Sequence, residues 1–334
     1  MQKLKMALVG AGIIGSVHAQ ALAESEYIDF VAVVDIQPEA ARAMAAQYGV
    51  RAYTSLESCL AEEEIDAVDI CVNEAYHVAP AVTAARAGKH ILMEKPIAQT
   101  VKEAEEILTV CRENQVRLMV AHLLHFDPRY AVLLDAVRQG KLGEISSIYV
   151  KRCNNLSTPK RIGGKVSFLY YIAVHDIELL CAYAGGRPVK VYAQFPNKVC
   201  SPYGDDDGIY AIVNFDNGVV GCIEVEWSYP ETTPMPVWSV AKVIGTGGAG
   251  IVEAGPSGLT LQVDGAFSYA DTLLSPVIGG KLHGDLAAEV NHFAKQVLEV
   301  QPFEVDLTTP VDAVRIIEAS LASKKTGLPI AIEY

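Results

Sequence analysis

A glycine-rich motif near the start of the chain is typical of a dinucleotide-binding turn. Gly10, Gly12 and Gly15 follow the pattern G-x-G-x-x-G between a short apolar run and a segment of helical period. The first glycine permits a tight turn, the second lets the backbone approach a pyrophosphate, and the third lets helix and strand pack closely. The start of the helix would face the phosphate charge, so Ile13 and Ile14 are expected cofactor contacts. Alone, the motif also fits a purely structural turn.

An acidic residue further along strengthens the dinucleotide interpretation. Asp35 stands 20 residues past Gly15, where a carboxylate accepts hydrogen bonds from the adenosine ribose hydroxyls. It would repel the additional phosphate of NADP, and Ile36 and Gln37 offer no compensating positive charge. We therefore expect NAD, with Ile36 among its contacts. Arg42, one helical turn further on, is the argument for NADP.

A lysine between an acidic residue and a proline is a candidate for chemistry. Glu94, Lys95 and Pro96 follow directly after a predicted strand, at the edge where ligands bind in open α/β sheets. The proline favours an extended backbone at Lys95, which would fix its ammonium over a bound ligand. An arbitrary lysine at a strand end would be a surface residue, but this position and the proline favour a role in the site.

A histidine in the second half is a candidate proton acceptor. His175 stands at the start of an apolar helical stretch, preceded by Tyr170 and Tyr171. A histidine facing a cleft can accept a hydroxyl proton near neutral pH. Taken alone, it is equally compatible with a structural histidine, and the two tyrosines with core packing.

The elements that must position these residues differ between the two halves of the chain. In the first 120 residues, β-rich runs alternate with helical segments, as in a parallel sheet covered by helices. The predicted strands are Lys3–Gly10, Phe30–Asp35, Ala67–Val72, His90–Met93 and Arg117–Ala121. The predicted helices are Ile13–Ala23, Pro38–Tyr48, Tyr76–Ala87 and Val101–Glu113. This is a doubly wound Rossmann layout.

Past residue 121 the pattern indicates an α+β domain with a large, mostly antiparallel open sheet. The predicted strands are Glu144–Cys153, Val189–Phe195, Gly208–Phe215, Val219–Ser228, Val237–Gly245, Gly250–Ala254 and Leu259–Val263. The predicted helices include Asp127–Gln139, Leu282–Val300 and Pro310–Lys324. We therefore divide the chain into an NAD-binding domain at 1–121 and a substrate-binding and oligomerisation domain at 122–334. The cleft between two such domains is the expected site.

Composition argues against several classes of partner. The 334 residues carry a formal net charge of −13, so we expect neither a nucleic acid nor an anionic membrane as partner. We find no apolar stretch near the ~20 residues that span a bilayer, and the first ten residues fit a strand better than a signal peptide. Seven cysteines without a C-x-x-C pair favour free thiols in the cytoplasm and no metal site.

Together these motifs resemble the glucose-fructose oxidoreductase, inositol dehydrogenase and rhizopine catabolism (Gfo/Idh/MocA) family. The matching segments are GAGIIG at 10–15, VVD at 33–35, EKP at 94–96, AHLLHFDPRY at 121–130, GKLGEI at 140–145, HDIELL at 175–180 and ASLASKKTGLPIA at 319–331. The resemblance implies NAD(P)-dependent oxidation or reduction of a sugar-like alcohol or ketone. It also implies a homodimer or homotetramer built on the second sheet.

The resemblance also implies roles for individual residues. Lys95 corresponds to the lysine that touches the nicotinamide ribose and the reacting hydroxyl, and His175 to the usual general acid/base. His77 keeps its place in the family pattern. With Asn73 and Glu94, it completes the cofactor contacts that we expect.

Three positions depart from the family pattern. Tyr171 stands where an aspartate is common four residues before the histidine, and His125 stands where an arginine is frequent. Val72-Asn73-Glu74 stands in place of the family's Thr-Pro-Asn, at the end of the strand predicted at Ala67–Val72. Because a tyrosine cannot orient His175 by charge, its phenol is expected to shape the pocket or to relay a proton.

The expected substrate is a sugar, polyol or nucleotide-linked sugar. Positive charge gathers at Lys151-Arg152 and Lys160-Arg161, and such groups bind phosphate or carboxylate, although a solvated basic loop is the simpler interpretation. The substrate contacts that we expect are Lys95, His122, Arg152, Arg161, Tyr171 and His175. Two alternatives remain open: a reductase of a non-sugar compound such as a cyclic ketone, and a non-catalytic protein that senses NAD.

Overall fold

The chain folds into two compact units. The computed structural model describes residues 3–233, 237–255, 258–263 and 266–334. The first unit comprises residues 1–126 and 273–307, and the second comprises 127–272 and 308–334. The sequence-based division at 121/122 predicted that all residues after 121 form one domain. The structure differs, because residues 273–307 return to the first unit.

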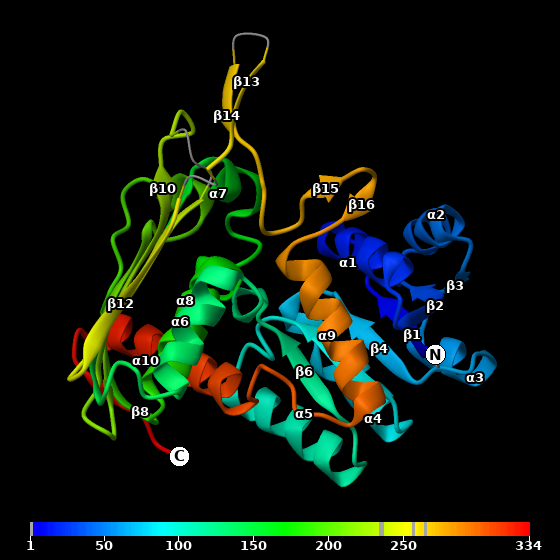
Figure 1. Cartoon of the computed structure of the whole chain (residues 1–334), viewed down its shortest axis with the longest axis horizontal. Helices are drawn as coiled ribbons and strands as arrows, with labels where there is room; N and C mark the ends of the chain where they lie inside the picture. The colour runs from blue at the N-terminus through cyan, green and yellow to red at the C-terminus, as the bar shows by residue number, and fades with distance from the viewer. Residues whose placement is uncertain (1–2, 234–236, 256–257, 264–265) are drawn as a thin grey trace. The chain divides into compact units, whose positions relative to one another are not determined.

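The described part of the first unit contains a parallel sheet of six strands in the order β3-β2-β1-β4-β5-β6 (Figure 1). The strands are β1 (Leu4–Val9), β2 (Ile28–Val34), β3 (Arg51–Tyr53), β4 (Ala67–Ile70), β5 (His90–Glu94) and β6 (Leu118–Ala121). The helices are α1 (Ile13–Glu24), α2 (Pro38–Tyr48), α3 (Leu56–Glu62), α4 (Val78–Arg86), α5 (Val101–Glu113) and α9 (Asp285–Glu299). This order confirms the predicted Rossmann fold, whose strand order reverses at β1 and β4, the place where ligands bind.

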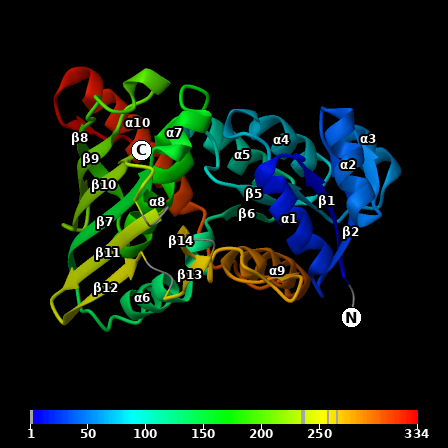
Figure 2. The same ribbon diagram turned by 90° about the horizontal axis from the view of Figure 1, so that it is seen from above.

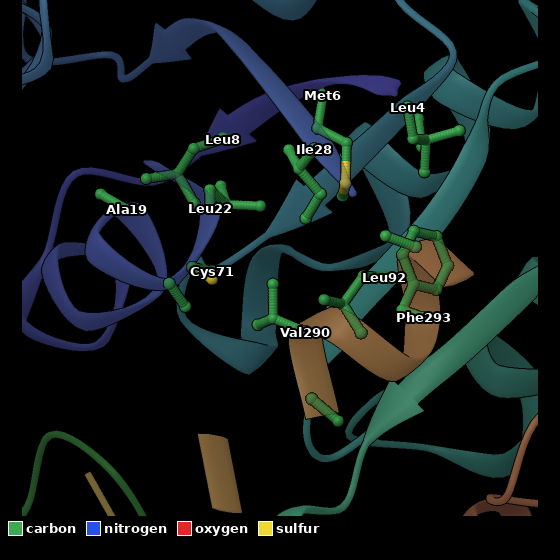
Figure 3. Close-up of a cluster of buried hydrophobic side chains, with 14 of the residues drawn as sticks. Leu4, Met6, Leu8, Ala19, Leu22, Ile28, Cys71, Leu92, Val290 and Phe293 are labelled. Atoms are coloured by element: carbon green, nitrogen blue, oxygen red, sulfur yellow. The ribbon is translucent and has the colours of Figure 1, made fainter. Parts of the chain in front are cut away.

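Helix α9 completes the hydrophobic core of this unit. Its buried face carries Leu286, Val290 and Phe293, which join the same core cluster as Leu8 of β1 and Leu92 of β5. Figure 3 shows Val290 and Phe293 beside Leu92. Apolar residues at this helical spacing must be covered, and the sheet of the first unit covers them. This packing is the physical reason why residues 273–307 belong to the first unit, although they come late in the sequence.

In the second unit, the described residues form a sheet of seven strands in the order β12-β11-β7-β10-β9-β8-β17 (Figure 2). The strands are β7 (Ile145–Asn155), β8 (Pro188–Gln194), β9 (Gly208–Phe215), β10 (Val220–Tyr229), β11 (Val237–Gly245), β12 (Gly248–Ala254) and β17 (Ile330–Ala331). Only β7 and β10 pair in parallel among these described strands. The predicted mostly antiparallel sheet is therefore confirmed. The small hairpin of β13 (Thr260–Val263) with β14 (Ala266–Tyr269) lies outside this sheet, and a second one, β15 (Val277–Ile278) with β16 (Lys281–Leu282), belongs to the first unit.

The two faces of this sheet differ. Helices α6 (Pro128–Arg138), α8 (Val174–Ala184) and α10 (Thr308–Thr326) pack against it, and the alternate residues that face them are buried. The other set of alternate positions is exposed and rich in large apolar side chains: Tyr192, Tyr210, Ile212, Val220, Trp238, Ile244 and Ile251. Strand alternation with period two separates these sets. An apolar face of this kind is typical of an interaction surface.

Several local features were not predicted. The sequence did not indicate β3 or α3, nor the short helix α7 (Ser157–Ile162) and the π-helical turn Leu169–Ala173. Each is seven residues or fewer, too short to show a hydrophobic period. Within the described ranges, no helix combines the length and the apolar character that crossing a bilayer requires.

We expect Phe293→Ala to destabilise the protein by about 3–5 kcal/mol, because it leaves a cavity where α9 meets the core. Lys295→Ala, at an exposed position of the same helix, is the matched control and should change the free energy of unfolding by less than about 0.5 kcal/mol. Urea unfolding followed by circular dichroism measures both. Equal effects of the two substitutions would show that α9 is not a core element.

Candidate functional site

The turn between β1 and α1 requires glycine for steric reasons. Gly10 has φ of 109°, and a Cβ there would lie 2.6 Å from the carbonyl oxygen of Cys71. A Cβ on Gly15 would lie 2.0 Å from the carbonyl oxygen of Gly10. A Cβ on Gly12, by contrast, would meet no atom within 4 Å. The backbone ahead of α1 is thus open, and it fits a pyrophosphate at the helix start.

Asp35 is held against this turn. Its Oδ2 accepts the backbone N–H of Ala11 at 2.7 Å, and its Oδ1 accepts that of Gln37 at 2.8 Å. Ile13 is 77% exposed and Ile36 is 83% exposed. Exposed aliphatic side chains next to a carboxylate and a glycine turn fit an adenosine group. Ile14, which is 36% exposed, lies on the same helix turn.

The loop after β5 carries Lys95 and is fixed by buried hydrogen bonds. The Lys95–Pro96 peptide bond is cis. The imidazole of His77 is buried, with Nδ1 2.8 Å from the Pro96 carbonyl oxygen and Nε2 3.1 Å from that of Val72. Burial lowers the pKa of His77 and so favours the neutral ring, whose single N–H donates to one of these two carbonyl oxygens. The ring contacts the loops that follow β4 and β5. Asn73 caps the 3₁₀ turn Glu74–Tyr76 by accepting the Ala75 N–H at 3.1 Å.

Two predicted site residues leave the sheet at the same edge. Glu94, the last residue of β5, pairs with Ala121, the last residue of β6. Lys95 and His122 are therefore the first residues beyond two neighbouring parallel strands. His122 is buried, and Lys95 is partly exposed.

A buried histidine that the sequence reasoning missed lies beneath this edge. His18 of α1 has Nδ1 2.9 Å from Asp69 Oδ2 and Nε2 3.2 Å from Glu94 Oε1. Cys71 Sγ donates to Asp69 Oδ1 at 3.4 Å. The ligand atoms of His18, Asp69 and Cys71 all lie within 4.8 Å of one another, and hydrogen bonds to Asp69 join the other two side chains to it. The sequence signal that could have identified His18 is its position three residues past Gly15, on the buried side of the nucleotide-binding helix α1.

In the second unit, Tyr171 and His175 stand at a break in helical geometry. Tyr171 lies in the π-helical turn Leu169–Ala173, which runs directly into α8 and its second residue, His175. Such turns are frequent at functional sites. A guanidinium nitrogen of Arg161 donates to the Tyr171 hydroxyl at 3.3 Å. The unit therefore brings Arg161 and Tyr171 into contact, and His175 follows Tyr171 by four residues along the same helical segment.

Arg152 is engaged by a carboxylate. Its Nε lies 2.5 Å from Asp176 Oδ2, and its Nη2 lies 3.3 Å from Oδ1. Both side chains are buried, and burial raises the pKa of Asp176. Because Asp176 follows His175 in α8, this ion pair joins β7 to the start of that helix. It thereby holds the backbone beside His175.

Comparison with known proteins gives the family. Residues 4–122 match the GFO_IDH_MocA model, described as an oxidoreductase family with an NAD-binding Rossmann fold. Residues 130–250 match the GFO/IDH/MocA C-terminal domain. Together these matches cover more than half of the chain, which therefore belongs to the Gfo/Idh/MocA family of oxidoreductases. The resemblance inferred from the motifs is confirmed.

Individual relatives are dehydrogenases. Inositol 2-dehydrogenase of Rhizobium meliloti (strain 1021) is 32% identical over 222 residues, which cover 64% of this chain and 66% of that protein. A 4-carboxy-2-hydroxymuconate-6-semialdehyde dehydrogenase of Sphingobium sp. (strain NBRC 103272 / SYK-6) is 27% identical over 57% of this chain and 62% of that protein. These matches thus span less than two thirds of either relative.

Solved structures share the whole fold. Scyllo-inositol dehydrogenase from Lactobacillus casei, solved with bound NAD(H) and scyllo-inositol, aligns with a TM-score of 0.82 over 99% of each chain. The sequence identity is 18%. This likeness therefore bears on the architecture of both units.

Proposed function

We propose that the protein is an NAD-dependent dehydrogenase or reductase that moves a hydride between nicotinamide and a hydroxyl-bearing carbon of a sugar, polyol or nucleotide-linked sugar. The observation that carries the proposal is the arrangement of the first unit. A glycine turn open at Gly12 and a lysine held at the carboxyl edge of β5 belong to one sheet. The inositol 2-dehydrogenase relative supports a cyclic polyol as the first substrate to test.

The roles of the side chains follow from their chemistry. NAD, when bound, supplies the hydride acceptor. In the oxidation direction, His175 takes the hydroxyl proton while the Lys95 ammonium stabilises the alkoxide that develops, and the C–O bond becomes C=O as hydride leaves. Tyr171 contacts the substrate and keeps its hydroxyl toward Arg161. The reverse direction returns the same proton from His175.

The side chains of the second unit suggest how the substrate is bound. Arg161 is exposed, so its guanidinium is available to a phosphate or carboxylate as well as to Tyr171. We assign Arg152 to the substrate region through its ion pair beside His175, and His122 to the same region from the edge of the first sheet. The semialdehyde dehydrogenase relative favours one second candidate, a carboxylated non-sugar carbonyl compound.

We further propose a homodimer or homotetramer in the cytoplasm. The exposed apolar face of the second sheet supports the assembly, because a second copy of the chain would cover Tyr210, Ile212 and Ile251. All seven cysteines fall in the described ranges and carry free thiols, which suits a reducing compartment.

The decisive experiment is a screen of myo-inositol, scyllo-inositol, other polyols, aldoses and nucleotide sugars with NAD, followed by NADH absorbance. On the best substrate, Lys95→Ala should lower turnover ~100-fold or more with a much smaller loss of NAD affinity, since one electrostatic donor at a developing charge is worth that much. Lys102→Ala, an exposed lysine of α5, is the matched control. Normal turnover of folded Lys95→Ala would refute this role, and failure of the whole screen would favour an NAD sensor.

We expect NAD to bind more tightly than NADP, because the Asp35 carboxylate would repel the additional phosphate of NADP and the adjacent Ile36 and Gln37 are uncharged. Arg42 is paired with Glu39 at 2.9 Å, so Arg42→Ala should leave the preference unchanged. The double variant Asp35→Ala, Ile36→Arg should shift it toward NADP. Fluorescence titration with NADH and NADPH measures all three proteins. Equal or tighter NADPH binding by the unmodified protein would contradict the expectation.

Tyr171→Phe separates the two possible proton carriers. If His175 is the base, loss of the hydroxyl should lower turnover less than ~10-fold and leave the acid limb of the pH profile in place, whereas His175→Asn should cost ~100-fold or more. Turnover against pH for both variants decides between them. A severe Tyr171→Phe defect beside an active His175→Asn enzyme would transfer the role to the tyrosine.

A further inference from the structure

The His18 imidazole is buried between two carboxylates, and each of its ring nitrogens faces one of them. Nδ1 lies 2.9 Å from Asp69 Oδ2, and Nε2 lies 3.2 Å from Glu94 Oε1. The His18 and Asp69 side chains are fully buried, and that of Glu94 is 8% exposed. An ionised carboxylate only accepts hydrogen bonds. Satisfying both contacts therefore requires a proton on each ring nitrogen, that is, an imidazolium.

The surrounding charges support this protonation state. Burial alone would lower the pKa of His18, but Asp69 and then Cys71 raise it well above its ordinary value. The pKa of Glu94 is lowered against the effect of burial, chiefly by His18 and then by Lys95. One buried cation thus stands beside two buried anions, with the Lys95 ammonium next to them.

Helix α9 brings two further carboxyl groups to the cluster. Burial raises the pKa of Glu289 well above its ordinary value, and Glu94, Asp69 and Asp285 add to the effect. Glu289 is buried, and its Oε1 has no hydrogen-bond partner among the described residues. Burial and the neighbouring carboxylates thus favour the uncharged form of Glu289, although the positive charge of His18 acts in the opposite direction. His18 is the group that counters the negative charge of Glu94 from within the buried part of the cluster.

Glu94 connects this cluster to the lysine of the site. While Oε1 faces His18, Oε2 accepts the backbone N–H of Lys95 at 3.0 Å. We propose that His18 is a positioning residue: its imidazolium orients the Glu94 carboxylate, which in turn holds the backbone of Lys95 at the carboxyl edge of β5. The inference rests on the proposed function in that Lys95 is the residue whose placement matters.

Two substitutions at one position separate this role from simple burial. The side-chain amide nitrogen of Asn lies about as far from Cα as Nδ1 of histidine. The amide nitrogen of Gln lies about as far from Cα as Nε2. His18→Asn should therefore keep the contact with Asp69 and lose that with Glu94, whereas His18→Gln should keep a donor toward Glu94. Ser25→Ala removes another side-chain hydrogen bond of the same unit, from the partly buried Ser25 hydroxyl to Asn291 Oδ1 at 2.6 Å, and is the control for lost stability.

The first measurement needs no substrate. In protein labelled with ¹⁵N-lysine, the Lys95 amide resonance should move and its hydrogen exchange should accelerate in His18→Asn, and both should stay near the original values in His18→Gln and Ser25→Ala. In the unmodified protein labelled with ¹⁵N-histidine, both ring nitrogens of His18 should be protonated at neutral pH. A neutral His18 ring, or an undisturbed Lys95 amide in folded His18→Asn, would overturn the proposal, and the ring measurement decides if that variant does not fold.

The second measurement uses the most rapidly oxidised polyol of the screen. His18→Asn should lower kcat ~10- to 100-fold with little change in KM, as expected when a reacting group is slightly misplaced, and His18→Gln should recover most of the loss. In the Lys95→Ala background, His18→Asn should lower kcat no further. A merely structural effect of His18→Asn would instead lower kcat in addition to the loss caused by Lys95→Ala. If Lys95→Ala itself is active, the proposed role of Lys95 fails, while the resonance measurements still decide whether His18 holds the Lys95 backbone.

Discussion

The first unit depends on the close approach of α1 to the end of β1. Only a hydrogen atom fits between the Gly15 Cα and the carbonyl oxygen of Gly10, since a Cβ would lie 2.0 Å from that oxygen. This approach leaves the backbone at Gly12 open ahead of the helix. A phosphate there can accept hydrogen bonds from backbone N–H groups of the first helical turn and is stabilised by the positive end of the helix dipole. The same approach also carries His18, one turn later, into the buried space between β4 and β5. A single steric condition thus serves both the cofactor turn and the charged cluster below Lys95.

Each unit uses a buried ion pair next to a residue with a proposed role in chemistry. Glu94, paired with His18, precedes Lys95, and Asp176, paired with Arg152, follows His175. Burying a charge is costly unless it is paired and hydrogen-bonded, so such pairs add little net stability while strongly favouring one geometry. They are therefore well suited to orient the backbone beside a reactive group. Neither pair uses the reactive side chain itself.

The sheet of the second unit has two faces of different character. The face covered by α6, α8 and α10 supports the start of α8, where Tyr171 and His175 stand at the end of a π-helical turn. The opposite face presents aromatic and aliphatic side chains from alternate positions of the same strands. Period-two alternation makes this possible without extra elements. The face beside the proposed reaction residues and the exposed apolar face are thereby kept apart.

The sequence by itself determined the features that depend on neighbours in the chain. The glycine spacing, Asp35 at the end of a strand, Lys95 before a proline and the alternation of both sheets can be predicted because local geometry and hydrophobic period require them. The tertiary structure alone decided the rest. α9 packs on β1 and β5 because its apolar face meets the first core, and His18 meets Asp69 and Glu94 because three separate elements converge there. Such contacts depend on which surfaces bury one another, and a pattern along one segment does not encode its distant partner.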